Sequence, residues 1–179
     1  MSLEVSPDME TVTAFESTLT ERDLATSVTV TSAEGFPAVL ADIIEPPVVA
    51  AELPFEGVSH DDVDVDVICS PSPAALDAAR TGVAAAGLAV ADYGTVTIRS
   101  TPGGEEFVSL YPERHVIVVA ASDVVPDMPA AFDRLAEEFD AGLDSQVLAT
   151  GPSATGDMGS LVRGVHGPQE VHVAILEDR

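Results

Sequence analysis

The segment at residues 115–121 constrains the fold more than any other, because after His115 it is an unbroken apolar run. A run of this kind is typical of a strand that is buried on both faces of a parallel sheet. Further strands are predicted at residues 27–31, where apolar and polar residues alternate, and at residues 48–53 and 65–69. Strands separated by helices favour an α/β fold built around a mostly parallel sheet.

Four helices are predicted between or beside these strands, and each follows a residue that favours a helix start. They span residues 7–24, 33–44, 73–86 and 128–141. The last is the clearest, because four apolar residues repeat at helical spacing before Gly142. These four are Met128, Phe132, Leu135 and Phe139. We expect their side chains to form the inner face of that helix.

The middle of the chain predicts an antiparallel hairpin. A strand at residues 94–99 is followed by a turn at residues 102–104 and by a second strand at residues 107–111. No internal repeat occurs, and no linker rich in proline, glycine or serine divides the chain. Residues 1–179 are therefore expected to form one domain, which is long enough to bury a core of its own.

The charged residues and the cysteine limit what the chain can bind. There are 31 acidic residues against 7 basic ones, which are all arginines, for a formal net charge of −24. Scattered arginines do not form the basic face that a nucleic acid requires. The absence of lysine excludes a Schiff base and a P-loop lysine. The single cysteine, Cys69, cannot by itself hold an iron–sulfur cluster or form an internal disulfide.

The acidic residues are spread along the chain rather than gathered in blocks. A uniformly anionic surface suits a cytosol of very high salt, where screening weakens the repulsion between like charges. We therefore expect a cytoplasmic protein of a halophilic archaeon; the alternative is a mesophilic acidic protein with a basic partner. No apolar run approaches the ~20 residues of a membrane span. No positively charged leader precedes an apolar core at the N-terminus.

Two glycine-rich turns flank a polar loop near the C-terminus. The first turn, at residues 151–152, follows a predicted strand at residues 147–149, and the second, at residues 164–168, precedes one at residues 170–176. Such turns beside strand ends build ligand crevices in α/β proteins. If the polar loop at residues 153–159 leads into a short helical turn, its free backbone N–H groups favour an anion. The sequence therefore predicts a crevice for a small anionic metabolite.

Each polar residue of this crevice has a functional and a structural interpretation. The ligand-binding candidates are Gly151, Pro152, Ser153, Thr155, Arg163, His166 and Gly167. The catalytic candidates are His166 and Asp157, because imidazole and carboxyl groups transfer protons. Alternatively, Ser153, Thr155 or Asp157 caps the next element, and His166 bonds to the backbone of its turn. His115 and His172 are expected to be structural, and no residues have a spacing typical of metal ligands.

The same stretch resembles the signature of the lactate-utilisation (LUD) domain family, and within it the C-type subunits. The resemblance is carried by Gly151-Pro-Ser-Ala-Thr155, Asp157, Leu161-Val162 and Gly164-Val-His-Gly-Pro168. Segments at residues 91–96, 108–112 and 115–119 match in the same order, so the resemblance is strongest over residues 88–176. It implies a three-layer αβα arrangement similar to the NagB/RpiA/CoA-transferase-like fold.

The resemblance also implies a role. C-type subunits belong to the iron–sulfur-dependent route from L-lactate to pyruvate, in which cysteine-rich partner subunits hold the clusters. A chain with one cysteine fits an accessory subunit that binds no cofactor of its own. The alternative is a stand-alone enzyme or metabolite-binding module for a phosphorylated or CoA-linked carboxylate, which rests on fold analogy.

Overall fold

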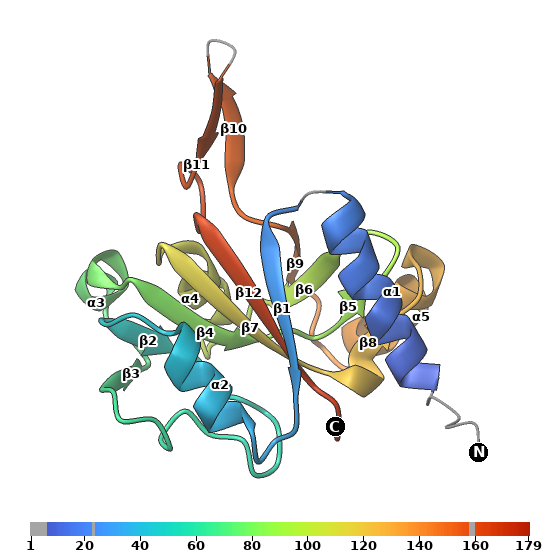
Figure 1. The fold of residues 1–179 in the computed structure, drawn as a ribbon, viewed down its shortest axis with the longest axis horizontal. Coiled ribbons are helices and arrows are strands. Elements are labelled where there is room, and N and C mark those ends of the chain that lie inside the picture. Colours follow the sequence, from blue (N-terminus) through green and yellow to red (C-terminus); the bar gives the residue numbers. More distant parts are fainter. Residues whose placement is uncertain (1–6, 23, 158–159) are drawn as a thin grey trace.

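The computed structural model describes residues 7–22, 24–157 and 160–179, and a parallel sheet lies at the centre of the fold (Figure 1). Within these residues six strands pair in the order β1-β12-β7-β4-β2-β3, and every pairing is parallel. They are β1 (Thr26–Thr31), β2 (Val48–Ala50), β3 (Val67–Cys69), β4 (Thr81–Ala85), β7 (Arg114–Ala120) and β12 (Glu170–Leu176). The predicted α/β class with a mostly parallel sheet is therefore confirmed.

One face of the central sheet is covered by a helix and by a second, smaller sheet. The helix is α1 (Pro7–Glu21), whose Val12, Phe15 and Leu19 are buried against β7 and β12. In the described residues the second sheet has the order β8-β5-β6-β9. Its strands are β5 (Ala89–Val90), β6 (Thr95–Arg99), β8 (Val124–Val125) and β9 (Gln146–Thr150). The main core therefore lies between two sheets, with α1 closing one side.

The other helices complete the layers. Helix α2 (Phe36–Ile43) buries Phe36 and Leu40 against the opposite face of the central sheet. The short helices α3 (Pro73–Ala78) and α4 (Glu105–Leu110) pack beside β2 and β4. Helix α5 (Met128–Asp140) packs on the second sheet, and a 3-10 turn, η1 (Ala121–Asp123), follows β7. None of the helices in the described part of the chain is long and apolar enough to cross a membrane.

Helix α5 begins where the sequence predicts but turns a different face inward. Asp127 caps it by accepting a hydrogen bond from the Ala130 amide at 2.9 Å. Leu135 is buried as expected, but its inner partner is Ala131, whereas Phe132 and Phe139 are exposed. The inner face is therefore narrower than the apolar spacing suggests, and two aromatic rings remain at the surface.

The helix predicted at residues 73–86 is wrong in its second half. Helix α3 ends at Ala78, and the chain continues as β4, whose five residues are all buried between β2 and β7. A side chain at Gly82 has no room, because a Cβ there would lie 2.1 Å from the Val108 carbonyl oxygen of α4. Alanines favour a helix locally, but hydrogen-bonded pairing along both edges of this strand overrides that preference.

The hairpin predicted at residues 94–111 is also wrong. Strand β6 pairs with β5 and β9, and the second expected strand is helix α4 instead. Gly104 precedes α4 with a φ of 80°, and Glu105 and Glu106 occupy its first turn, where carboxylates favour a helix. Their side chains accept hydrogen bonds from the hydroxyls of Thr101 and Ser100.

An antiparallel hairpin occurs where a polar loop is expected, and the short helical turn on which the anion site depends does not form in the described residues. It pairs β10 (Ala154–Asp157) with β11 (Ser160–Arg163) and projects from the body of the molecule (Figure 1). Residues 158 and 159 of the expected loop lie outside the described residues. The two glycine-rich turns therefore lie at the base of a projecting ribbon.

Candidate functional site

A cavity of about 460 Å³ opens between the central sheet and strands β6 and β9 of the second sheet. This volume lies in the range of sites that hold drug-sized ligands. Its wall includes Thr26, His115 and Val171, which lie at the amino ends of β1, β7 and β12. Crevices in open α/β sheets commonly lie at the carboxyl ends of the strands. Here the second sheet and the two turns form a cavity at the opposite end.

The two glycine-rich turns are joined to each other by Ser153. Its hydroxyl oxygen accepts a hydrogen bond from the His166 amide at 3.1 Å, and its own amide donates to the Pro168 carbonyl at 2.8 Å. The Gly164 amide donates to the Ser153 carbonyl at 3.0 Å. The first turn needs glycine, because Gly151 has a φ of 65° and a Cβ there would lie 2.8 Å from a carbonyl oxygen.

This arrangement brings together most, but not all, of the predicted ligand-binding residues. Those that line the cavity are Gly151, Pro152, Ser153, His166 and Gly167. Thr155 and Arg163 lie on the β10–β11 hairpin and are not part of the lining. Asp157 ends β10, and its side chain lies outside what the structure describes. The amides of Ser153, Gly164 and His166 already donate to protein acceptors, so they are not free to bind an anion.

His115 is the cavity residue that the sequence does not reveal. It is one of the residues that line the cavity, it is only 2% exposed, and its buried Nε2 atom has no hydrogen-bond partner among the described residues. Burial lowers the pKa of His115 to about 3, so the ring is neutral near pH 7. The available signal was a polar residue at the start of an otherwise apolar strand, which also fits a capping or core role.

The cavity has a buried apolar floor and an exposed rim. The floor is formed by the buried side chains of Phe15, Val96, Ile98, Ile117 and Val173, together with His115. Exposed residues at the rim include Leu110, Val147, Thr150 and His166. Among the described residues that line it there is no aspartate, glutamate, lysine or arginine. The floor therefore favours an uncharged group, and only the rim is accessible to water.

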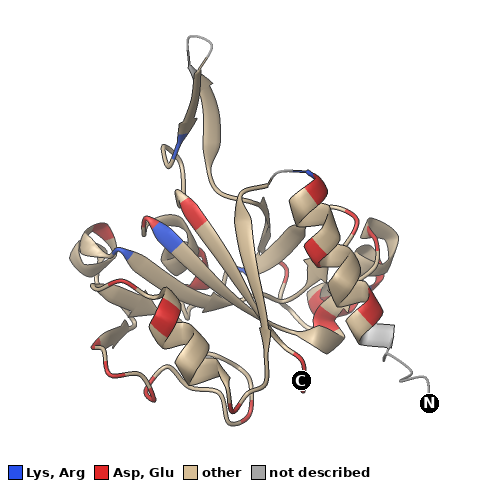
Figure 2. Cartoon of the chain, in the orientation of Figure 1, with Lys and Arg blue, Asp and Glu red and all other residues tan. Residues whose placement is uncertain are grey.

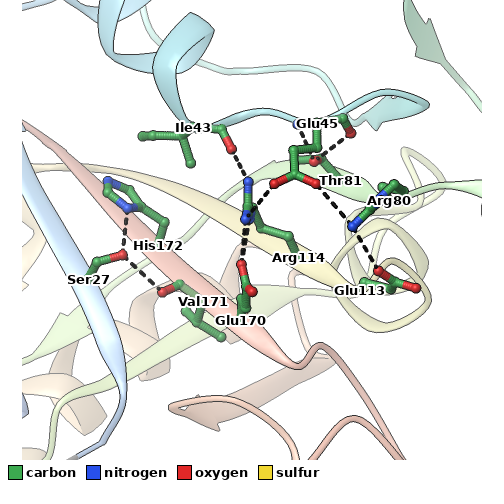
Figure 3. Close-up of polar contacts among 10 residues, drawn as sticks. All are labelled: Ser27, Ile43, Glu45, Arg80, Thr81, Glu113, Arg114, Glu170, Val171 and His172. Atoms are coloured by element: carbon green, nitrogen blue, oxygen red, sulfur yellow. Dashed lines mark hydrogen bonds and ion pairs between the residues drawn. The ribbon is translucent and has the colours of Figure 1, made fainter.

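A second polar group of residues lies on the other face of the central sheet (Figure 3). Arg114 donates from Nε and Nη2 to Glu170 at 2.8 and 2.6 Å, and from Nη1 to the Ile43 carbonyl. Its Nη2 also lies 3.0 Å from Glu45, which forms a second ion pair with Arg80 at 3.0 Å. We call Glu45, Arg80, Glu113, Arg114 and Glu170 the charge cluster. Its contacts join α2 to the sheet.

His172 has the structural role expected of it. Its Nδ1 lies 2.6 Å from the Ser27 hydroxyl (Figure 3). Its Nε2 lies 3.1 Å from the Thr29 hydroxyl, so it connects β12 to β1. Burial, and secondarily the charge of Arg114, lower the pKa of His172. In the described part of the chain, no three His, Cys, Asp or Glu side chains are gathered closely enough to hold a metal ion.

Comparison with known proteins identifies the family. Residues 74–176 match the LUD domain, so the chain belongs to the LUD domain family. It is 32% identical over 105 residues to lactate utilization protein C of Geobacillus sp. strain WCH70, and 31% identical over 105 residues to that of Bacillus subtilis strain 168. Each match covers 56% of this chain but only 44% of the relative, so the chain spans less than half the length of these proteins.

A solved structure supports the fold. The chain is similar to the crystal structure of a DUF162 family protein from Deinococcus radiodurans, with a TM-score of 0.70 and 21% sequence identity. The superposition covers 97% of this chain and 100% of that one. At this identity the likeness concerns the arrangement of strands and helices and carries no function.

Proposed function

We propose that this chain is a non-redox component of a lactate-utilisation system. The observation that carries the proposal is the LUD domain match over residues 74–176, together with relatives called lactate utilization protein C. The match covers only 44% of each relative. We therefore infer the role of this chain from the matching part alone.

The redox chemistry of such a system belongs, in this proposal, to cysteine-rich iron–sulfur subunits. An iron–sulfur cluster is held by about four protein ligands, usually cysteines. This chain has one cysteine, Cys69, which is exposed on β3 and is not part of the cavity wall. The chain itself would contribute a contact surface and a pocket for a small molecule.

The projecting β10–β11 hairpin is the surface that we assign to the iron–sulfur partner. A two-stranded hairpin is marginally stable alone in water, and exposed apolar side chains mark interaction surfaces. Leu161 is 67% exposed on this hairpin, Val162 on the same strand is also exposed, and Val165 is exposed just after it. A partner that covers these side chains would stabilise the ribbon and bury its apolar surface.

The test is co-purification of the tagged full chain from native cells in high-salt buffer, with iron content and partner identity as readouts. We expect a cysteine-rich iron–sulfur protein to co-purify with the wild type and to be lost with Leu161→Ser. The matched control is Phe139→Ser, which replaces an exposed apolar residue on α5 and should retain the partner. Absence of any such partner from the wild type contradicts the proposed role. Retention by Leu161→Ser contradicts the assignment of the hairpin.

The anionic metabolite expected from the sequence belongs, in this proposal, at the rim. The polar side chains of Thr150 and His166 are exposed there, and that of Ser153 is partly exposed. The contact between Ser153 and His166 runs through the backbone amide of His166, with the serine oxygen as acceptor. It therefore does not activate the serine as an adjacent general base would. The alternative of a stand-alone enzyme gains no support from this geometry.

We also propose that the protein works in a cytosol of high salt, as in a halophilic archaeon. Acidic residues lie on helices, loops and strand ends around the body, and basic residues are few (Figure 2). Screening of a net charge of −24 should raise the free energy of unfolding as KCl increases. Urea denaturation across a KCl series tests this. A midpoint that stays constant or falls contradicts the proposal.

A further inference from the structure

We propose that the floor of the cavity binds an uncharged, mainly apolar molecule through one carbonyl or hydroxyl group, and that His115 is the hydrogen-bonding partner of that group. This inference rests on the proposed function only in taking the cavity as the ligand site.

The first argument is that His115 lacks a partner within the protein. Its neighbours across the sheet are Gly82 on β4 and Val171 on β12, which have no polar side-chain atom. Its Nε2 is buried and unpaired among the described residues. A buried polar group without a hydrogen bond costs free energy, and most such groups in native proteins have a partner. An apolar side chain of similar size would fill the same space without that cost, so the ring is suited to a group that arrives from outside.

The second argument concerns charge. The His115 ring is neutral, because its surroundings do not support the protonated form. A neutral imidazole has one donor nitrogen and one acceptor nitrogen, and a half-turn about Cβ–Cγ exchanges each nitrogen with a ring carbon. It can therefore meet a carbonyl or a hydroxyl. A carboxylate at the same depth would have no positive charge near it among the described lining residues.

The third argument concerns the body of the ligand. The floor around His115 is aromatic and aliphatic, with Phe15, Ile98 and Ile117 all buried. A volume of about 460 Å³ accommodates a ring system rather than a three-carbon acid alone. The exposed residues Thr150 and His166 mark the rim as the entrance. Because His115 belongs to the floor, the ligand would enter with its carbonyl or hydroxyl group first and its apolar part behind.

The test uses 1-indanone and indane, which share a carbon skeleton and differ by one carbonyl. Titration followed by saturation-transfer NMR gives the dissociation constant of each. In the wild type we expect 1-indanone to bind about five- to tenfold more tightly, the effect of one neutral hydrogen bond. In His115→Phe we expect that preference to vanish while indane binding is kept. His172→Gln, on the opposite face of the same sheet, should keep the preference.

Equal affinities in the wild type, no binding of either probe, or a preference that survives in His115→Phe would each overturn the proposal. A second measurement covers the case in which the variant does not fold. The ¹⁵N shifts of the His115 ring in the wild type should move with 1-indanone and not with indane. Loss of the iron–sulfur partner in co-purification leaves this test intact, so the two proposals fail separately.

Discussion

Arg114 and His115 are neighbours in β7, yet their side chains lie in opposite environments. Successive residues of a strand point to opposite faces of the sheet. Arg114 points toward α2 and joins the charge cluster, where it contacts two carboxylates and a carbonyl. His115 points toward the second sheet, lines the cavity and has no side-chain partner among the described residues. Arg114 is fully paired, whereas His115 has a buried nitrogen without a hydrogen-bond partner among the described residues.

The difference shows how pairing decides what burial does to a titratable group. Burial lowers the pKa of the Arg114 guanidinium, but the hydrogen bond and charge of Glu170, with the charge of Glu45, outweigh it, and the pKa is raised. Burial lowers the pKa of His115 with no opposing group. The paired residue therefore stabilises the fold, whereas the unpaired one costs stability until a ligand meets it.

The largest expected effect is at Gly82, which lies beside His115 in the sheet. Gly82→Ala places a Cβ 2.1 Å from the Val108 carbonyl oxygen, so α4 must shift. We expect a loss of about 3 kcal/mol in the free energy of unfolding and loss of 1-indanone binding, because Ser109 and Leu110 of α4 line the cavity. Urea denaturation measures the first. The control is Gly156→Ala, where a Cβ meets nothing within 4 Å and the change should be about 0.5 kcal/mol or less.

The second effect is the part of the pH dependence that comes from His115, which the comparison with His115→Phe isolates from that of His172. The pKa of His115 is about 3 in the folded state and near 6.5 when unfolded, so the unfolded state binds the extra proton between these values. Stability from this residue is therefore lost as the pH falls below about 6.5. Between pH 7 and pH 5 the wild type should lose about 2 kcal/mol more than His115→Phe. Parallel pH profiles of the two proteins, measured in the same salt, would contradict a buried, neutral ring.

The third effect separates the two neighbours directly. Arg114→Met removes the contacts to Glu170, Glu45 and Ile43 and should cost about 1–2 kcal/mol, since the two carboxylates remain half exposed and hydrated. It should leave the preference for 1-indanone unchanged. His115→Phe should show the reverse pattern, with stability at pH 7 kept or raised and the preference lost. Any loss of the preference in Arg114→Met would mean that the two faces are coupled.

The fold also shows which features can be predicted from the sequence and which cannot. Helix α1 and strand β7 follow from local patterns, because one apolar stripe or one apolar run decides which face is buried. Strand β4 is missed because its alanines favour a helix locally. Its strand form depends on pairing with β2 and β7, which are distant in sequence.

The candidate site likewise contains residues that local patterns predict and one residue that they do not. Ser153 and His166 are predicted to lie together because turn residues near each other in sequence bring them together. His115 is missed because the cavity joins α1, β6, β7, β9 and β12, and no local pattern records that meeting. The unpaired nitrogen that distinguishes it from an ordinary core histidine is visible only when all of these elements are in place.

The smallest effect lies at the outer end of the charge cluster. Arg80 is 55% exposed and pairs with Glu45 and Glu113, which are themselves 47% and 60% exposed. Such pairs contribute little, so Arg80→Gln should cost about 0.5 kcal/mol or less at low salt. The loss should disappear in about 1 M KCl, where charges are screened over about 3 Å. The loss in Arg114→Met should persist there, because its less exposed guanidinium also donates to the Ile43 carbonyl. Denaturation of both variants at low and high KCl measures this. If both losses vanish together in salt, the charge cluster is a surface feature throughout and Arg114 does not anchor α2.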